Sequence, residues 1–334
     1  MKTTLAVFLF LISFPLISAA EQKRFDFMQK HMGTAFRITI YAESAADAKK
    51  AAERAFEKVA LVDRALSDYQ PASELALLQK DVPLDWRDIS PAFARALKTS
   101  LEISEKTGGL FDVSLGTLTR LWRKAREAKK LPSRTDLAVA RSNAGFKLIE
   151  YKNDKIRFRK PGVQLDFGGI GKGIAVDEAF ESLERSGFKA ILVAGGGDLR
   201  AGGPPPGRQA WRIGIASVSA HHSGSFVEIR DRALSTSGDL EQFIEIENRR
   251  YSHIIDPRTG LGSRERKVVT VTANNSATAD AMATALVMAD RKTAGFLARR
   301  MKDLEFVAST PQESFSSKRF PKVRLIASNA ELKP

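Results

Sequence analysis

The segment Val163–Asp177, with the sequence V-Q-L-D-F-G-G-I-G-K-G-I-A-V-D, constrains the fold more than any other part of the chain. Its apolar residues at 163, 165 and 167 alternate with others and predict a strand. Glycines then surround Lys172, and a helical pattern runs from about Ile174 to Ser186. A strand, a glycine-rich turn and a helix form a geometry that holds phosphate. Glycines let backbone N–H groups approach an anion, and a helix N-terminus adds partial positive charge.

This segment alone leaves two interpretations open. It does not match the Walker pattern, because Gly173 stands where that pattern has Ser or Thr after Lys172. It does not match the dinucleotide fingerprint either, because G-x-G-x-G is one residue shorter than G-x-G-x-x-G. A tight structural turn therefore accounts for the segment as well as a nucleotide site does.

Residues 1–20 are typical of a secretory signal peptide. Lys2 supplies a positive start, Leu5–Ile17 is apolar, and Ser18-Ala19-Ala20 offers a small-residue cleavage site before Glu21. The apolar run is shorter than the roughly 20 residues of a spanning helix, and an uncleaved inner-membrane anchor is the alternative. The chain has no cysteine, which suits a periplasm that oxidises stray thiols. We expect an exported, periplasmic protein whose residues 21–334 form one domain.

The chain is basic, with a formal net charge of +14. Such a charge is compatible with nucleic acid, a membrane surface or a small anionic ligand. Basic residues cluster in Arg120–Lys130 and Arg264–Lys267, but aromatic residues do not interleave with them at a spacing that suits nucleic acid. Export also argues against nucleic acid, so we expect no such partner and interpret these clusters as solvated basic surface.

The pattern of elements predicts an α+β fold. Strand and helix patterns follow one another without an internal repeat or a clear linker, which indicates a single compact unit of mixed, largely antiparallel sheets with flanking helices. The expected helices follow Ser44 and Ser90 and span Arg134–Ala144, Ala277–Ala289 and Lys292–Met301. The expected strands are a pair in Phe25–Tyr41, then Phe146–Tyr151, Lys155–Arg159, Lys189–Ala194, Trp211–Ala216, Phe226–Arg230, Gln242–Ile246, Arg250–Ile255, Lys267–Ala273, Glu305–Ala308 and Lys322–Ala327.

Asp280 and Thr284 are candidate metal ligands. They are four residues apart in the apolar helix pattern A-T-A-D-A-M-A-T-A-L-V-M-A, so they share one face. A buried carboxylate needs a partner, and carboxylate and hydroxyl oxygens are hard ligands that suit Mg²⁺. The alternative is structural: Asp280 serves as a cap or ion pair, and Thr284 bonds back to the preceding turn.

His253 is a candidate general base. It lies in Y-S-H-I-I-D-P-R-T-G, at the end of an expected strand and before a turn that contains Asp256. Imidazole is the side chain that most readily exchanges a proton near neutral pH. A surface histidine beside a hairpin is the structural alternative.

Seven motifs in order resemble one family, the FAD:protein FMN transferases, also called the flavin transferase (ApbE) family. The resemblance covers nearly the whole chain after residue 20, and the combination is far more specific than any single motif. The motifs are M-G-T at 32–34, F-D-V at 111–113, L-D-F-G-G-I-G-K-G at 165–173, G-G-G-D at 195–198, S-T-S-G-D at 235–239, H-I-I-D-P-R-T-G at 253–260 and A-D-A-M-A-T at 279–284.

The resemblance implies an activity and a set of site residues. Members bind FAD and Mg²⁺, move FMN from FAD through a phosphoester bond onto a threonine hydroxyl of an acceptor protein, and release AMP. Their metal ligands correspond to Asp280, Thr284 and the backbone carbonyl of Gly169, whereas Ala283 stands where some members carry a further Asp. Gln79 replaces a frequent Asn and is assigned no role. The residues that should contact FAD are Met32, Tyr69, Leu110, Phe111, Asp112, Asp166, Lys172 and Ile255.

The chemistry of the residues agrees with this activity. Mg²⁺ and Lys172 can neutralise charge on the phosphoryl oxygens, and a threonine nucleophile needs a base, for which His253 is the candidate. Acceptor sites in the family resemble Ser/Thr-Gly-Ala-Ser/Thr, a run that is absent from this chain. The expected acceptor is therefore another exported or membrane protein, such as a subunit of a membrane electron-transport complex.

Two other functions are compatible with the sequence. One is an FAD pyrophosphatase, in which water replaces the acceptor hydroxyl and the products are FMN and AMP. The other is a passive periplasmic flavin-binding protein, which would need neither the Asp280–Thr284 pair nor His253. Incubation with FAD, Mg²⁺ and a peptide bearing the acceptor motif distinguishes the transferase from both, because only the transferase adds the mass of FMN to the peptide.

Overall fold

A computed structural model describes residues 21–218, 224–239 and 243–325. The predicted signal peptide, residues 1–20, lies outside this part of the chain, so its cleavage and the domain boundary after it stay predictions.

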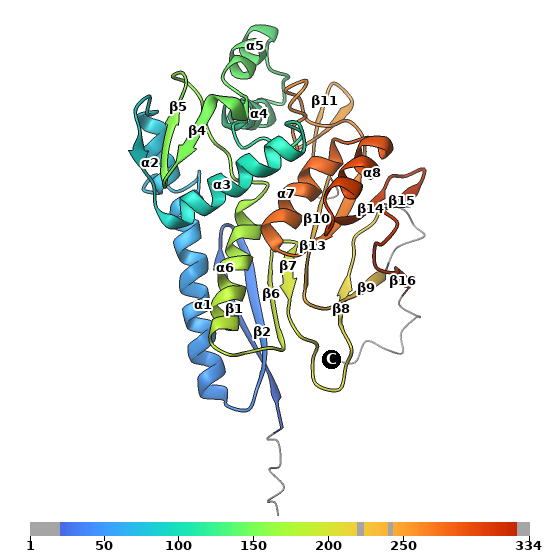
Figure 1. Cartoon of the computed structure of the whole chain (residues 1–334). Coiled ribbons are helices and arrows are strands. Elements are labelled where there is room, and N and C mark those ends of the chain that lie inside the picture. Colours follow the sequence, from blue (N-terminus) through green and yellow to red (C-terminus); the bar gives the residue numbers. More distant parts are fainter. Residues whose placement is uncertain (1–20, 219–223, 240–242, 326–334) are drawn as a thin grey trace, which may run out of the picture.

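The centre of the molecule is an eight-stranded antiparallel sheet with the strand order β1-β2-β6-β7-β10-β13-β14-β15 (Figure 1). It begins as a hairpin, in which Met32 and Gly33 both adopt positive φ between β1 and β2. Its strands are β1 (Lys23–His31), β2 (Thr34–Ala42), β6 (Ile191–Gly195), β7 (Asp198–Ala201), β10 (Arg232–Gly238), β13 (Val268–Ala273), β14 (Glu305–Ser309) and β15 (Ser314–Ser316).

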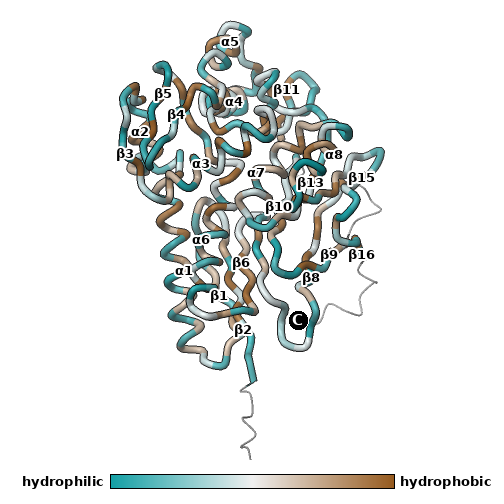
Figure 2. Tube along the Cα trace, in the orientation of Figure 1, coloured by the Kyte–Doolittle hydropathy of each residue, from teal (hydrophilic) through white to brown (hydrophobic). Residues whose placement is uncertain are grey.

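Three long helices cover one face of this sheet (Figure 1). They are α1 (Ala45–Leu66), which contacts β1 and β2, α6 (Gly171–Arg185), which contacts β6 and β7, and α7 (Ser276–Val287), which contacts β10 and β13. Ser44 caps α1 by accepting a hydrogen bond from Asp47 N, and Asn275 caps α7 by accepting one from Thr278 N. Strand β6 is strongly hydrophobic (Figure 2), and its buried residues belong to one apolar cluster with those of α1, α6 and α7, so the main core lies between the sheet and the helices.

The remaining elements form smaller layers around this core. The sheet that contains Trp211 covers part of the other face of the large sheet, where the Trp211 ring packs edge-on against Tyr41 of β2. The smaller sheets contain β3 (Arg87–Asp88), β4 (Ile149–Lys152) and β5 (Lys155–Phe158); β8 (Trp211–Gly214), β9 (Ser225–Ile229) and β16 (Arg324–Leu325); and β11 (Phe243–Ile246) and β12 (Arg249–Ser252). The remaining helices are α2 (Glu74–Lys80), α3 (Pro91–Lys106), α4 (Gly116–Ala128), α5 (Arg134–Ser142) and α8 (Arg291–Arg300), with a 3₁₀ turn at Phe146–Leu148.

This architecture confirms the predicted α+β fold of antiparallel sheets with flanking helices. The predicted strand at 163–167 is wrong, because this segment is extended and buried but forms only a single bridge, from Gln164 to Leu115. Its backbone groups bond elsewhere: Asp166 N donates to Val113 O, and Leu165 N donates to the side chain of Gln79. Helix α6 also begins earlier than predicted, so Lys172 lies in its first turn.

Candidate functional site

The site is built where the N-terminal turn of α6 meets the first half of α7. Gly173 allows this contact, because a Cβ at this position would lie 2.5 Å from the carbonyl oxygen of Ser276. Asp177, one turn along α6, is fully buried and accepts hydrogen bonds from the backbone N–H groups of Ser276 and Ala277, both at 2.9 Å. This carboxylate therefore satisfies the first N–H groups of α7 and fixes the two helices against each other.

Lys172 lies between two buried carboxylates. Its Nζ is 2.9 Å from Oδ2 of Asp198 and 3.6 Å from Oδ2 of Asp280. The aliphatic part of Lys172 packs against the turn between β6 and β7, where a Cβ at Gly196 would lie 3.0 Å from Lys172 Cδ and 3.1 Å from Thr34 Cγ2. Lys172 of the α6 motif thus meets two other sequence motifs, the G-G-G-D motif at the β6–β7 turn and the Asp280 motif on α7, and Thr34 of the β1–β2 hairpin lies against the same turn.

The charges of this group are strongly coupled. Burial and the nearby Asp198 raise the pKa of Asp280 above its ordinary value, while Lys172 and the N–H of Gly173 oppose that rise. Burial alone would lower the pKa of Lys172, but Asp198 and Asp280 raise it further than burial lowers it, so Lys172 stays charged. Asp198 also accepts a hydrogen bond from Ser235 at 2.5 Å. With both carboxylates ionised, this buried group would carry a formal charge of −1, which a bound cation would offset.

The three predicted metal ligands lie next to one another. Asp280 and Thr284 are one turn apart on α7, and a Cβ at Gly169 would lie 3.0 Å from Oγ1 of Thr284. Asp280 is 2% exposed and also accepts a hydrogen bond from Gly173 N at 3.1 Å. A carboxylate, a hydroxyl and a backbone carbonyl form a hard oxygen donor set that fits Mg²⁺. Within the described residues, no three His, Asp or Glu side chains gather at one metal site.

Two predicted FAD contacts flank the turn before α6. The backbone N–H of Met32 donates to Oδ2 of Asp63 at 3.1 Å, and Cε of Met32 lies 3.2 Å from where a Cβ at Gly171 would be. Phe111 is buried, and Cε2 of its ring lies 3.4 Å from the place that a Cβ on Gly169 would occupy. The half-buried Leu110 packs against the same core.

Asp166 and Tyr69 lie together with a cation that the sequence analysis did not identify. Oδ1 of Asp166 accepts a hydrogen bond from Gly168 N at 2.7 Å, and Oδ2 is 3.7 Å from the guanidinium of Arg123. The same guanidinium lies 4.8 Å from the ring centroid of Tyr69 and forms an ion pair with Asp68. Tyr69 is 78% exposed, so its ring is accessible to a ligand.

Asp112 borders a separate small cavity of about 210 Å³ beside Leu118, Arg141 and Pro257. Its carboxylate accepts hydrogen bonds from the N–H and hydroxyl of Ser114 and from the N–H of Phe146. Burial raises the pKa of Asp112, although these hydrogen bonds oppose the rise. A polar cavity that ends at a fixed carboxylate is suited to bind a donor group of a nucleotide.

The segment with Ile255 and His253 belongs to a different layer. Ile255 is buried in a second apolar cluster with Leu118 and Trp122. His253 is half-buried and directly follows β12. Both oxygens of Asp256 bind the guanidinium of Arg258, at 2.9 and 2.8 Å, so this carboxylate already has a cation. The roles of His253 as base and of Asp256 as its partner stay predictions.

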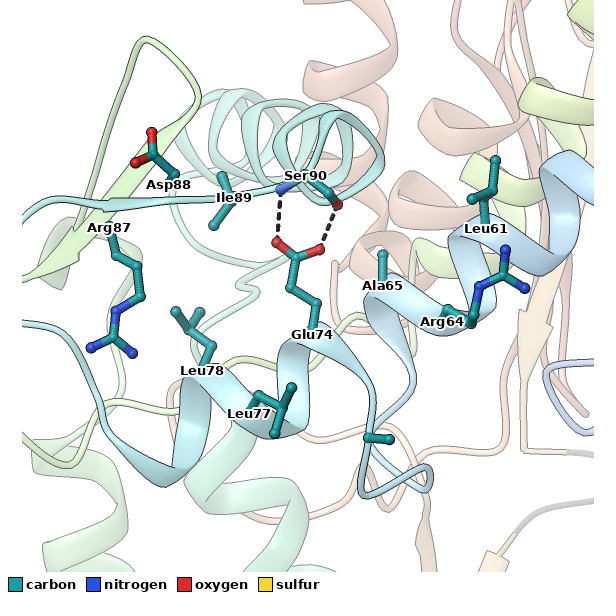
Figure 3. Close-up of a pocket in the computed structure, with 11 residues that line it drawn as sticks. Leu61, Arg64, Ala65, Glu74, Leu77, Leu78, Arg87, Asp88, Ile89 and Ser90 are labelled. Carbon is teal, nitrogen blue, oxygen red and sulfur yellow. Dashed lines mark hydrogen bonds between the residues drawn. The ribbon is translucent and has the colours of Figure 1, made fainter.

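A larger cavity, of about 450 Å³, lies between α1, α2 and the segment before α3 (Figure 3). The carboxylate of Glu74 accepts hydrogen bonds there from the N–H of Ser90 at 2.7 Å and from its hydroxyl at 2.5 Å. These bonds tie α2 to the N-terminus of α3. The residues that line this cavity include none of the predicted site residues, so it is not part of the candidate site.

Fold and geometry together describe an α+β protein in which a buried group of carboxylate, hydroxyl and ammonium side chains lies beside the N-terminus of α6. The sequence model of the ApbE family matches residues 32–308 of this chain. An FAD:protein FMN transferase of Escherichia coli strain K12 is 28% identical over 297 residues, 86% of this chain and 85% of that protein. Another, from Vibrio cholerae, is 30% identical over 263 residues, 77% of this chain and 79% of that protein.

Solved structures lead to the same family. The apo form of the Pseudomonas stutzeri flavinyl transferase ApbE superimposes with a TM-score of 0.79 at 26% identity, covering 89% of this chain and 96% of that one. The flavin transferase ApbE from Vibrio cholerae gives a TM-score of 0.80 at 24% identity, covering 90% and 98%, and supports the fold. The chain belongs to the ApbE family, as its motifs predicted.

Proposed function

We propose that this chain is a Mg²⁺-dependent FAD:protein FMN transferase that attaches FMN to a threonine hydroxyl of an acceptor protein. The family and the printed names of its relatives support the transferase activity. The observation that carries the proposal is the convergence of Lys172, Asp280, Thr284 and Gly169 beside the N-terminus of α6. This arrangement combines hard oxygen ligands with a fixed cation, as transfer from a diphosphate requires.

The proposed reaction is a displacement at the FMN phosphorus of FAD. The acceptor hydroxyl oxygen forms a bond to this phosphorus, the bond from the phosphorus to the bridging oxygen breaks, and AMP leaves. His253 takes the hydroxyl proton. Lys172, which its carboxylate neighbours keep charged, stabilises the phosphoryl oxygens. A Mg²⁺ ion held by Asp280, Thr284 and the Gly169 carbonyl would supply further charge neutralisation.

The direct test offers the protein FAD, Mg²⁺ and a peptide with the motif Ser/Thr-Gly-Ala-Ser/Thr. We expect the peptide to gain FMN and AMP to appear in equal amount, whereas a peptide with Ala in place of the acceptor hydroxyl stays unmodified. Release of FMN and AMP with an unmodified peptide would instead indicate an FAD pyrophosphatase. FAD that binds but stays intact would indicate a passive flavin-binding protein.

The acceptor and its location form the second part of the proposal. We place the mature protein in the periplasm, with an exported or membrane acceptor such as a subunit of an electron-transport complex. The signal-like residues 1–20 support this placement. None of the helices in the described ranges is long and apolar enough to cross a bilayer. N-terminal sequencing of periplasmic protein should begin at Glu21; an intact Met1 on membrane-bound material would contradict the placement.

A further inference from the structure

Arg123 connects three parts of the chain beside the proposed flavin site. It lies on α4, and its guanidinium forms an ion pair with Asp68, lies 4.8 Å from the ring centroid of Tyr69 and is 3.7 Å from Oδ2 of Asp166. Asp68 and Tyr69 follow α1, whereas Asp166 precedes α6. One side chain therefore contacts two residues that are expected to bind FAD, and a third that anchors it.

The arrangement restrains groups that would otherwise be free to move. Tyr69 is 78% exposed, and an exposed ring without neighbours loses rotational freedom when a ligand packs on it. A guanidinium over an aromatic face is attracted by the negative charge of the ring face. The side chain of Arg123 is only 33% exposed, and that of Asp68 only 14%, so the ion pair gives the guanidinium a fixed position.

We propose that Arg123 is a positioning residue for FAD: it holds the Tyr69 ring and the Asp166 carboxylate in place before FAD binds. This inference rests on the proposed function. Preorganisation reduces the entropy that binding must overcome, so Arg123 acts on the affinity for FAD. It does not touch the phosphorus-transfer groups on α6 and α7 in any contact described above, so the rate at saturating FAD should be insensitive to it.

The test compares Arg123→Met, which keeps the aliphatic stem, with Arg123→Lys and with Arg126→Met, an exposed arginine three residues further along α4. We expect Arg123→Met to raise the Kd and KM for FAD by about 2- to 5-fold, with little change in kcat at saturating FAD. Arg123→Lys should recover only part of the affinity, because an ammonium cannot lie flat on the ring. Arg126→Met should bind FAD like the parent.

A double-mutant cycle with Tyr69→Leu separates positioning from a general effect on stability. If Arg123 acts through Tyr69, the two substitutions together should weaken FAD binding by less than the product of their separate effects. An Arg123→Met protein with a lower melting temperature but the parental Kd would overturn the inference, because Arg123 would then be merely structural. Fully independent effects on the Kd would overturn the link to Tyr69. A parent protein that does not bind FAD would overturn the proposed function, and this inference with it.

Discussion

Nζ of Lys172 lies 2.9 Å from Oδ2 of Asp198, and this ion pair changes what Asp280 can do. Because Asp198 already neutralises the ammonium, Asp280 adds a formal negative charge that Lys172 does not balance, although its Oδ2 is only 3.6 Å from the same Nζ. A buried carboxylate without a full counter-charge is costly. A second buried carboxylate therefore lies beside Thr284 and Gly169, where the metal is proposed to bind and where a cation would favour its ionised form.

Gly173→Ala should destabilise the protein and disrupt the site. The new Cβ would lie 2.5 Å from the Ser276 carbonyl oxygen, so α6 and α7 must move apart. We expect a loss of about 1–3 kcal/mol in the free energy of unfolding, measured by urea denaturation, together with weaker Mg²⁺-dependent transfer. Gly214→Ala is the matched control, because its nearest atom is 4.0 Å away. Parental stability of Gly173→Ala would show that this close approach is not required.

Glu181→Gln should remove a pH-dependent part of the stability. Burial alone would raise the pKa of Glu181, but Arg95, Arg200 and Arg185 lower it below its ordinary value of 4.5. Because the folded pKa is the lower one, this stabilisation is complete above about pH 4.5 and is lost as the pH falls through the folded pKa. Glu181→Gln should therefore cost about 1–3 kcal/mol at pH 7 and progressively less below pH 4.5. Equal unfolding free-energy differences at pH 7 and pH 3 would refute this assignment.

His253→Ala should separate binding from transfer. His253 is not itself among the expected FAD contacts, and the substitution leaves the nearby contact Ile255 in place, so we predict a parental Kd for FAD. Loss of the base should lower the transfer rate by roughly 10²–10⁴-fold. Fluorescence titration with FAD and the rate of peptide labelling measure the two quantities on one preparation. A variant that labels the peptide at the parental rate would exclude His253 as the base.

Helical spacing alone was enough to place Asp280 and Thr284 one turn apart on the same helix, as α7 shows. It could not predict that Gly169 lies against Thr284, because that contact joins residues far apart in the chain. The alternation at 163–167 correctly predicted which side chains are buried. It did not predict strand pairing, because the backbone N–H groups of Asp166 and Leu165 donate to the carbonyl of Val113 and to the side chain of Gln79.

Helix α4 shows why the role of a single charged residue was missed. Its N-cap, Leu115, offers no side-chain cap as a signal, and the sequence pattern led us to interpret its basic residues as solvated surface. Arg123 gains a role only because folding brings Asp68, Tyr69 and Asp166 to it. In the same way, the G-G-G-D motif was identified, but the contact from Asp198 to Lys172 required the fold.

Metal binding at Asp280 is tested by the rate of FMN transfer to the peptide as a function of Mg²⁺ concentration, measured for the parent and for Asp280→Ala. The fold should survive this change, because alanine favours helix and the Lys172–Asp198 pair is retained. We predict Mg²⁺-stimulated transfer and a Mg²⁺-induced rise in melting temperature for the parent and for Asp303→Ala, an exposed-carboxylate control. Asp280→Ala should show neither. Full activity and the parental Mg²⁺ response in Asp280→Ala would contradict the proposed metal site, because the metal would then bind elsewhere.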